Sequence, residues 1–433
     1  MKKFLAVLLA LTMVLAMAAC GSSSSSSAAT TAAAAASADA SSDTAESSGE
    51  AFQEHYKIGV IEVQLNDEST NRATWFREYI APRYNVEFMF SEACTDLNAA
   101  MTFIENAADA GCQAIINYYP IGANTEQLIQ LCAEYGMYFV ENGGRNAAND
   151  AAYAAKYDNF CGAFMADQPD TGKLFHDYLV ETLDTSVEHG FLLCTGGAYQ
   201  GNAQQTEISS NMLSAISELC GLTFDKSIEE LYQSDAPIEA TNDKGVAVYC
   251  YPGMPSTSGW LEGLTAALQT GKYDYLLTAP NCLANIGTAV SETEAAMNQD
   301  ITIIGFGTFG EALTSAMHST DIFGNQTVAM STVKFTSIVS TMGFAKVYNA
   351  LTGHMDANLD ENGEPSVILF RMNAVTSPEQ LDAMSSWDTS GKWVADYDLI
   401  DSCLAVLNDG LTNEQIQENI YSYDYDAIAA RLG

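Results

Sequence analysis

The sequence predicts an α/β protein that contains two parallel β-sheets, each flanked by helices. The first observation is a series of short β-branched and aromatic runs from Lys57 onward, separated by amphipathic stretches. Their starts lie roughly 23 to 29 residues apart, the spacing of a strand plus a crossover helix. Strands that are apolar along their whole length are typical of parallel sheets buried on both faces. The runs are KIGVIEV, VEFMF, QAIINYY, MYFVEN and FCGAFM.

A second series of such runs follows the first. It comprises GFLLC from Gly190, VAVYC from Val246, YLLTA from Tyr275 and DITIIGF from Asp300. Because alternating strands and helices form a covered parallel sheet, two series in one chain predict two α/β lobes with a cleft between them.

The stretch DLNAAMTFIENAADAG shows how the helices are predicted. Asp96 is a candidate N-cap, and Gly111 stands where a helix end favours a left-handed residue. The helical period predicts one buried face made of Leu97, Met101, Ile104 and Ala108.

The N-terminus has the pattern of a secretory signal peptide, residues 1–19. Lys2 and Lys3 precede an apolar stretch that ends in small residues before Cys20. The ending MAACG resembles the lipobox of bacterial lipoproteins, with Met17 where Leu is usual. That resemblance implies cleavage before Cys20, lipidation of its thiol, and stable anchoring to a membrane by two or more acyl chains. Plain cleavage with an unmodified Cys20 is the alternative.

Residues 20–50 are rich in Ser and Ala and contain no Leu, Ile, Val or aromatic residue. Such a segment has no apolar surface to bury, so we expect the lipidated Cys20 to be followed by a disordered linker. No later segment has 18 unbroken apolar residues, so we expect no further membrane span.

The composition limits the partners and cofactors. A formal net charge of −38 argues against nucleic acid as a partner, because phosphate binding needs clustered Lys and Arg. Nine cysteines besides Cys20 form no C-x-x-C pair, and several lie in apolar runs, so we expect mostly reduced, buried thiols. Five scattered histidines give no metal signature. We therefore expect no metal and no cofactor.

The order of five stretches resembles the type I periplasmic binding proteins, the ribose- and galactose-binding receptors of ABC transporters. The resemblance covers about residues 56–380 and implies a two-lobed fold, with the ligand held between the lobes. It is carried by DLNAAMTFIENAADAGCQAIINYYP, ADQPDTGKLFHDYL, YLLTAPNCLANIGTAV, ITIIGFGTFGEALTSAM and TVAMSTVKFTSIVSTMGFAKVYNALTGH.

The resemblance also implies where the chain crosses between lobes. The N-terminal lobe would be 51–166 plus 331–371, and the C-terminal lobe 167–330 plus 372–386. Residues 226–245 would be an insertion in the second lobe, and 387–433 a helical C-terminal extension beyond the usual end of the family.

Ligands of open α/β sheets bind outside the carboxyl ends of the strands. The residues there are rich in aromatic rings and amides, with one guanidinium, which suits a polar ring compound. The predicted ligand-binding residues are Asn66, Tyr118, Tyr119, Asn142, Arg145, Tyr199, Tyr251, Asn281 and Thr308, with Gln64, Asp67 and Thr195 beside them.

The resemblance is uneven at these positions. Asn66, Arg145 and Asn281 fall close to sugar-contacting positions of the ribose-binding group. Gly307 stands where that group has an Asp, Met330 where it has a hinge Gln, and residues 198–209 lack its arginine. These departures argue against a pentose or hexose recognised in the usual way.

Several of these residues also have a structural interpretation. Tyr118 or Tyr119 could be core, Arg145 a surface charge, and Asn281 a helix cap. Asp167 is favoured as a helix cap or hinge hydrogen bond.

Two motifs resemble ion-binding loops. The stretch Asp356–Glu364 alternates Asp and Asn like a calcium loop, but Leu369 stands where the final Glu is needed, so an acidic turn is favoured. TGGAYQGN lacks the lysine of a phosphate-binding loop.

Together these features predict a lipid-anchored extracytoplasmic solute-binding protein. It would be a monomer that delivers a small polar ligand, a carbohydrate or polyol, to the permease of an ABC importer. A nucleoside receptor and a sensory binding protein for a chemoreceptor or kinase are the alternatives. We expect no enzyme, because the chain shows neither a nucleophile elbow nor a zinc signature.

Overall fold

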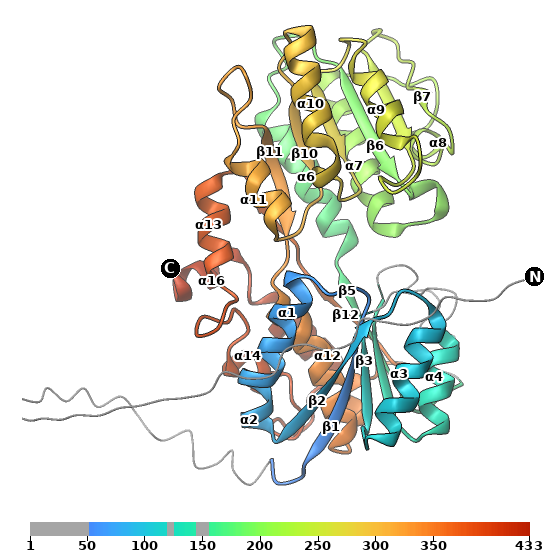
Figure 1. Cartoon of the computed structure of the whole chain (residues 1–433), viewed down its shortest axis with the longest axis vertical. Coiled ribbons are helices and arrows are strands. Elements are labelled where there is room, and N and C mark those ends of the chain that lie inside the picture. Colours follow the sequence, from blue (N-terminus) through green and yellow to red (C-terminus); the bar gives the residue numbers. More distant parts are fainter. Residues whose placement is uncertain (1–51, 119–124, 144–155) are drawn as a thin grey trace, which may run out of the picture. The chain divides into compact units, whose positions relative to one another are not determined.

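The first series of apolar runs forms one parallel sheet in the computed structural model, which describes residues 52–118, 125–143 and 156–433 (Figure 1). Its strand order is β12-β5-β4-β3-β1-β2. Every neighbouring pair runs parallel, as the continuously apolar strands predict. The strands are β1 (Tyr56–Glu62), β2 (Val86–Ala93), β3 (Ala114–Asn117), β4 (Tyr138–Asn142), β5 (Phe160–Ala166) and β12 (Val367–Phe370).

Helices cover both faces of this first sheet. Ile61, Ile115 and Phe139 pack toward α3 (Leu97–Asp109) and α4 (Thr125–Glu134). Because side chains alternate along a strand, Val60 and Ile116 point to the opposite face. That face carries the long helix α12 (Thr336–Leu351) and a run of three helical elements, α1 (Asp67–Thr74), a π-helix (Trp75–Ile80) and α2 (Ala81–Tyr84).

The predicted helix at residue 97 is confirmed, but its buried face is different. Asp96 caps α3 by accepting a hydrogen bond from the Ala99 amide at 2.9 Å, and Gly111 has φ of 82°. The buried residues are Ala100, Phe103, Ile104 and Ala107. Of the predicted face only Ile104 is fully buried. Leu97, Met101 and Ala108 are partly buried at the edge of the core, and Phe103 occupies its centre.

The second series forms a seven-stranded sheet of order β13-β11-β10-β9-β6-β8-β7. Its five central strands are parallel, and the two edge strands pair antiparallel to their neighbours. The strands are β6 (Phe191–Gly196), β7 (Ile238–Glu239), β8 (Val248–Pro252), β9 (Tyr275–Thr278), β10 (Thr302–Gly305), β11 (Val328–Val333) and β13 (Asn373–Val375).

Alternating strand residues again pack toward helices on two faces. Leu193, Leu277 and Ile304 belong to the core cluster that contains residues of α6 (Gln168–Thr182), α7 (Ala203–Cys220) and the short α8 (Ile228–Tyr232). Leu192 and Leu276 belong to the opposite cluster. Its helices are α9 (Trp260–Leu268), α10 (Leu283–Met297) and α11 (Glu311–His318).

The chain crosses between the two sheets three times: from β5 to α6, from β11 to α12, and from β12 to β13. We call these the three crossings. Strand β11 lies in the second sheet up to Val333. The predicted limits of the lobes, 51–166 plus 331–371 and 167–330 plus 372–386, remain a prediction.

The remaining helices follow the last strand: α13 (Pro378–Ser386), α14 (Tyr397–Ser402), α15 (Asn413–Tyr421) and α16 (Tyr425–Leu432). We call residues 387–433 the C-terminal segment. Its side chains Trp387, Ile400 and Ile416 are buried in the same hydrophobic core as α12.

The nine cysteines of the described residues are free thiols, and only Cys220 among them is not buried. Burial raises the pKa of Cys112 to about 11 and that of Cys250 to about 12, so these thiols remain protonated and unreactive. In the part of the chain that the structure describes, no helix is both long and apolar enough to cross a membrane.

Candidate ligand site

The carboxyl end of β1 leads into a tightly capped helix. Asn66 accepts a hydrogen bond from the Ser69 amide at 3.0 Å, and the Ser69 hydroxyl accepts one from the Asn66 amide at 2.8 Å. This capping box satisfies two amides that would otherwise lack partners at the start of α1. The cap places the next two residues, Asp67 and Glu68, at the strand ends.

A buried ion-pair network lies beside this cap. Arg72 Nε is 2.7 Å from Glu62 Oε1, and Arg72 Nη2 is 3.3 Å from Glu68 Oε1. Lys334, which follows β11, approaches the same Glu68 oxygen at 3.1 Å. Glu62 is 3% exposed and Arg72 is 4% exposed. The network therefore joins the first sheet to the crossing from β11 to α12.

Burial and charge compete in setting the pKa values of this network. Burial raises the pKa of Glu62 above its ordinary value although Arg72 opposes it. Burial also acts to raise the pKa of Glu68, but the charges of Lys334 and Arg72 outweigh it and lower that pKa to about 2. Glu68 is therefore a carboxylate at any physiological pH.

Tyr118, at the end of β3, lies against the same arginine. The Arg72 guanidinium carbon is 3.6 Å from the centre of the Tyr118 ring, which is a cation–π contact. Among the described residues, neither the Tyr118 hydroxyl nor Arg72 Nη1 has a hydrogen-bond partner. Two buried polar groups thus lie next to strand ends where the sequence predicts a ligand.

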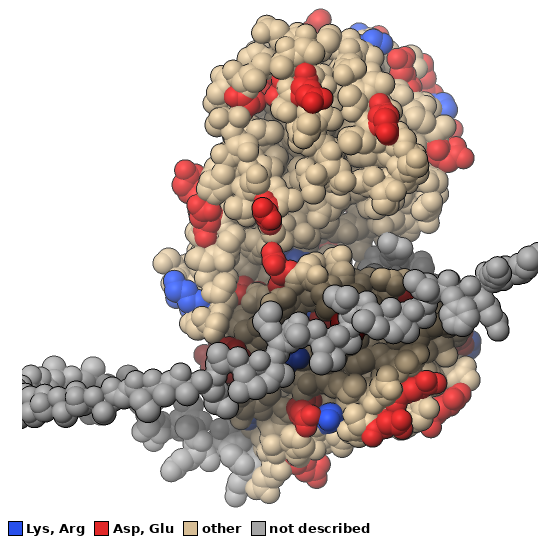
Figure 2. Space-filling model, viewed as in Figure 1, with Lys and Arg blue, Asp and Glu red and all other residues tan. Residues whose placement is uncertain are grey.

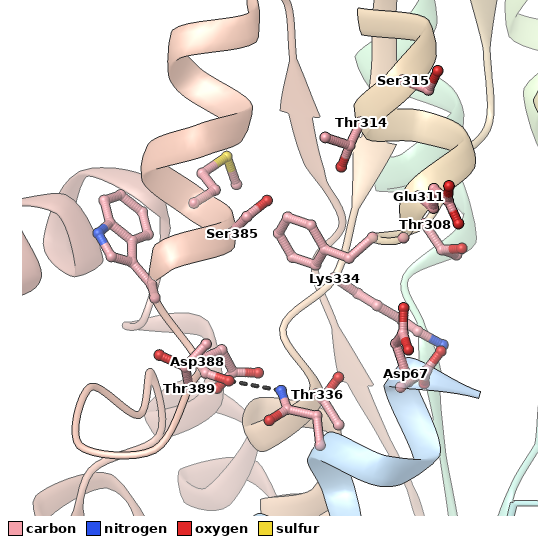
Figure 3. A pocket seen from close by; sticks show the side chains of 16 residues that line it. Asp67, Thr308, Glu311, Thr314, Ser315, Lys334, Thr336, Ser385, Asp388 and Thr389 are labelled. Carbon is pink, nitrogen blue, oxygen red and sulfur yellow. Dashed lines mark hydrogen bonds and ion pairs between the residues drawn. The ribbon is translucent and has the colours of Figure 1, made fainter. Parts of the chain in front are cut away.

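A cavity of about 560 Å³ opens beside this network (Figure 3). Lys334 extends toward the side of the cavity where Asp67, Thr308 and Glu311 lie. The walls of the cavity come from the start of α1, the loop after β10 and the start of α11, the residues after β11, and the stretch from α13 into the C-terminal segment. They are Asp67, Glu68, Asn71, Thr308, Phe309, Gly310, Glu311, Thr314, Ser315, Lys334, Thr336, Met384, Ser385, Trp387, Asp388 and Thr389.

Two of the residues expected at the strand ends, Asp67 and Thr308, line this cavity, and Asn281 and Asn66 lie next to lining residues. Thr308 lines it, and the Asn281 amide donates a hydrogen bond to the Thr308 hydroxyl at 3.2 Å. Asn281 does not cap α10, whose N-cap position is Cys282. Asn66 precedes the lining residue Asp67, although its side-chain oxygen is engaged in the cap.

Other predicted residues lie elsewhere. Tyr251 is buried, and its hydroxyl uses its only donor in a hydrogen bond to the Trp260 carbonyl at 2.8 Å. The Tyr199 hydroxyl accepts from the Gln200 amide at 2.8 Å. Asn142 is half-buried at the end of β4. Tyr119, Arg145 and the predicted lipidation site Cys20 lie outside the described residues.

The structure describes the two positions, Gly307 and Met330, at which the sequence differs from the expected pattern. A Cβ on Gly307 would lie 2.4 Å from the Ser331 hydroxyl oxygen, so no side chain fits there without a shift. Met330 is fully buried in the core of the second sheet. In this chain neither position presents a polar side chain to the cavity.

Sequence reasoning missed the ion-pair network and the wall formed by the C-terminal segment. Glu62 gives one usable signal, because it is an acid inside the apolar run KIGVIEV, and a buried acid needs a partner.

Asp167 has the favoured role of a helix cap: it caps α6 by accepting a hydrogen bond from the Asp170 amide at 3.1 Å. In the predicted acidic turn, Asp360 accepts from the amides of Asn362 and Glu364.

One cluster of three carboxylates among the described residues could hold a metal ion. Glu294, Asp300 and Asp321 bring their oxygens within 4.8 Å of one another. Glu294 is 1% exposed and accepts from the Ile301 amide at 3.2 Å. Burial, together with the charges of Asp321 and Asp300, raises the pKa of Glu294 to about 7. The group thus holds a carboxyl that is easily protonated.

Replacing Glu294 by glutamine should therefore change stability in a pH-dependent way. A carboxyl with a higher pKa in the folded state loses its favourable contribution as the pH rises from its ordinary value of 4.5 toward about 7. Glu294→Gln should melt at a higher temperature than the wild type at pH 8 and show no such gain at pH 4.5. The exposed Glu292→Gln is the matched control. An equal difference at both pH values would contradict the expectation.

No protein-family model and no curated protein sequence matches the chain. Solved structures match it in fold. An ABC transporter solute-binding protein from Bacillus halodurans with bound myo-inositol is 16% identical, with a TM-score of 0.50 over 77% of this chain and 98% of that chain. One from Clostridium phytofermentas with bound L-rhamnose is 10% identical, with a TM-score of 0.51 over 77% and 99%.

A periplasmic ribose ABC transporter protein from Conexibacter woesei is 12% identical, with a TM-score of 0.51 over 77% of this chain and 96% of that chain. At these identities the likeness concerns the fold. The predicted two-lobed α/β fold, with parallel sheets flanked by helices, is confirmed.

Proposed function

We propose that the chain is an extracytoplasmic solute-binding protein that delivers a carbohydrate or polyol to an ABC importer. The observation that carries the proposal is the cavity of about 560 Å³, which lies at strand ends of both sheets and beside a crossing. Its volume is in the range of small-molecule sites. The ligands named for the structural neighbours, myo-inositol and L-rhamnose, support the same class.

The lining of the cavity favours a neutral, hydroxylated ligand. Carboxylates, hydroxyls and an amide can bond sugar hydroxyls, while Phe309 and Trp387 offer apolar faces for C–H surfaces. The cation Lys334 is already paired with Glu68. Figure 2 shows many Asp and Glu and few Lys and Arg side chains on the face in view, in keeping with the net charge of −38. An anionic ligand would meet repulsion.

The proposal includes anchoring by a lipidated Cys20 and a permease as the partner, as the sequence predicts. Binding would occur without covalent change to the ligand, and closure of the two lobes would present the loaded form to the permease. A nucleoside ligand and a sensory partner are the alternatives. A thermal-shift screen that includes nucleosides distinguishes a nucleoside ligand from a sugar or polyol.

A thermal-shift screen of the full chain tests the proposal. Sugars, polyols, nucleosides and amino acids are compared, with glucose and glucuronate as a matched neutral and anionic pair. At a ligand concentration of about 100 Kd the stabilisation is about 2.7 kcal/mol, which raises the melting temperature of a chain of this size by about 3 °C. A neutral sugar or polyol should give this shift. If only nucleosides or amino acids do, the ligand class is wrong.

Replacing Thr308 by valine should weaken binding about tenfold, because the ligand and Asn281 both lose a hydroxyl partner. The exposed Thr270→Val is the matched control and should bind like the wild type. Equal affinity of both variants, measured by calorimetric titration of the stabilising sugar, would exclude this cavity as the binding site.

A further inference from the structure

The C-terminal segment contacts the first crossing, from β5 to α6. Asp167 is the N-cap of α6, so its carboxylate fixes the backbone where the chain leaves the first sheet. The hydroxyl of Tyr421, at the end of α15, donates a hydrogen bond to the other oxygen of this carboxylate. Asp167 also donates its backbone amide to the Phe370 carbonyl at 2.8 Å, which ties the first crossing to the third.

The segment also contacts the second crossing, from β11 to α12. The N-cap residue of α12, Phe335, has no side-chain hydrogen bond to the helix. Asp388 supplies the cap instead: its carboxylate accepts from the Ser337 amide at 2.9 Å and from the Ser337 hydroxyl. Trp387 packs against Phe335, with ring centres 6.1 Å apart.

Gln417 holds the edge strand β12 just before the third crossing, from β12 to β13. This side chain accepts from the Leu369 amide at 2.6 Å and donates to the Leu369 carbonyl at 2.9 Å, as a neighbouring strand would. Arg371 is two residues after Leu369, and its guanidinium carbon lies 4.4 Å from the centre of the Tyr421 ring. One short helix, α15, thus touches the first and third crossings at once.

The opposite side of the segment is fixed to helices of the first sheet. The Tyr397 ring stacks on Tyr79 with centres 4.1 Å apart and planes at 3°. Asp401 accepts from the Tyr84 hydroxyl at 2.7 Å and pairs with Arg83. These contacts anchor the segment to one sheet while its other residues hold the crossings.

We propose that the C-terminal segment is a brace that restrains movement of the second sheet relative to the first and so regulates ligand exchange at the cavity. Closure about a hinge requires φ and ψ changes in the few residues that connect the moving parts. Tyr421 bonds to Asp167, which lies in the first crossing. Gln417 bonds to Leu369 at the end of β12, and Asp388 bonds to Ser337 at the start of α12, so each bond restrains an element that adjoins a crossing. Residues Trp387 to Thr389 also form part of the cavity wall. The regulatory part of this inference rests on the proposed function.

Distance distributions between the two sheets test the brace without any ligand, so failure of the sugar screen and failure of the brace remain distinguishable. Labels are placed at the exposed positions Asp109 and Thr270 through an unnatural amino acid, because the chain carries native cysteines. In the Tyr421→Phe, Gln417→Ala double variant of the full chain, the width of the distribution should at least double. The exposed Tyr135→Phe is the matched control and should match the wild type.

An unchanged width in the folded double variant would overturn the proposal. If the double variant does not fold, Tyr421→Phe alone decides, because it removes one hydroxyl and keeps the ring beneath Arg371. A wider distribution in that single variant supports the brace, and the wild-type distribution refutes it.

Discussion

Replacing Arg72 by methionine should lower the free energy of unfolding by about 3–5 kcal/mol, because Glu62 would stay buried and lose its partner. Methionine keeps much of the length and apolar surface of the arginine, so the change is chiefly in charge and hydrogen bonding. Urea unfolding followed by tryptophan fluorescence measures the loss.

This loss should also depend on pH. Burial already raises the pKa of Glu62, and removing the guanidinium would raise it further. A carboxyl whose pKa is higher in the folded state takes up a proton on folding, so its contribution to stability falls as the pH rises toward the folded-state pKa. Arg72→Met should therefore cost more at pH 8 than at pH 5.

Two variants control for the Arg72 result. Arg77→Met replaces an exposed arginine of the neighbouring helical turn that contacts the Phe90 ring face, and should lower stability by no more than about 1 kcal/mol. The double variant Glu62→Gln, Arg72→Met should be more stable than Arg72→Met alone. Its stability difference from the wild type should not show the pH dependence that Glu62 causes in Arg72→Met. A loss that is equal at both pH values would show that Glu62 is not the group responsible.

Replacing Asp388 by alanine should cost about 2–4 kcal/mol. The substitution removes the cap of α12 and leaves the buried amide and hydroxyl hydrogens of Ser337 without an acceptor, although the hydroxyl oxygen still accepts from the Ala395 amide. Asp388 also has φ of 55°, a left-handed conformation that alanine adopts less readily than aspartate. Equilibrium unfolding in urea measures the change.

The comparison variants separate the cap from the backbone conformation. Asp388→Gly relieves the left-handed strain and still lacks the carboxylate, so it should recover only a minor part of the loss. Asp235→Ala, an exposed aspartate in a loop, should be neutral. If the glycine variant were as stable as the wild type, the cap would contribute nothing.

The sheets could be predicted from the sequence because their strands are apolar along their whole length. Runs such as FCGAFM and ITIIG bury both faces, and a pattern of that kind excludes a half-exposed strand. The exact face of α3 could not be predicted, because two adjacent stripes, one with Met101 and one with Phe103, fit the helical period equally well.

The site was predicted less well because its groups are distant in sequence. Asn281 and Thr308 both follow strands, and the rule about strand ends found them. The same rule also selected Tyr251, which turns into the core and bonds Trp260. No local pattern pairs Asp388 with Ser337 or Lys334 with Glu68, since those pairs form only when the sheets and the C-terminal segment are assembled.

The strand order of the first sheet has a consequence for how the chain is made. Strand β12, residues 367–370, pairs with β5, residues 160–166, and Gln417 bonds to β12 in turn. A ribosome that has translated only as far as residue 330 has therefore produced a first sheet that lacks an edge strand, its longest helix and the contacts that fix its crossings. Contacts of such long range form late in folding. A nascent chain cut at that point therefore has the strands of the second sheet except the edge strand β13 and the end of β11, while its first sheet is still incomplete.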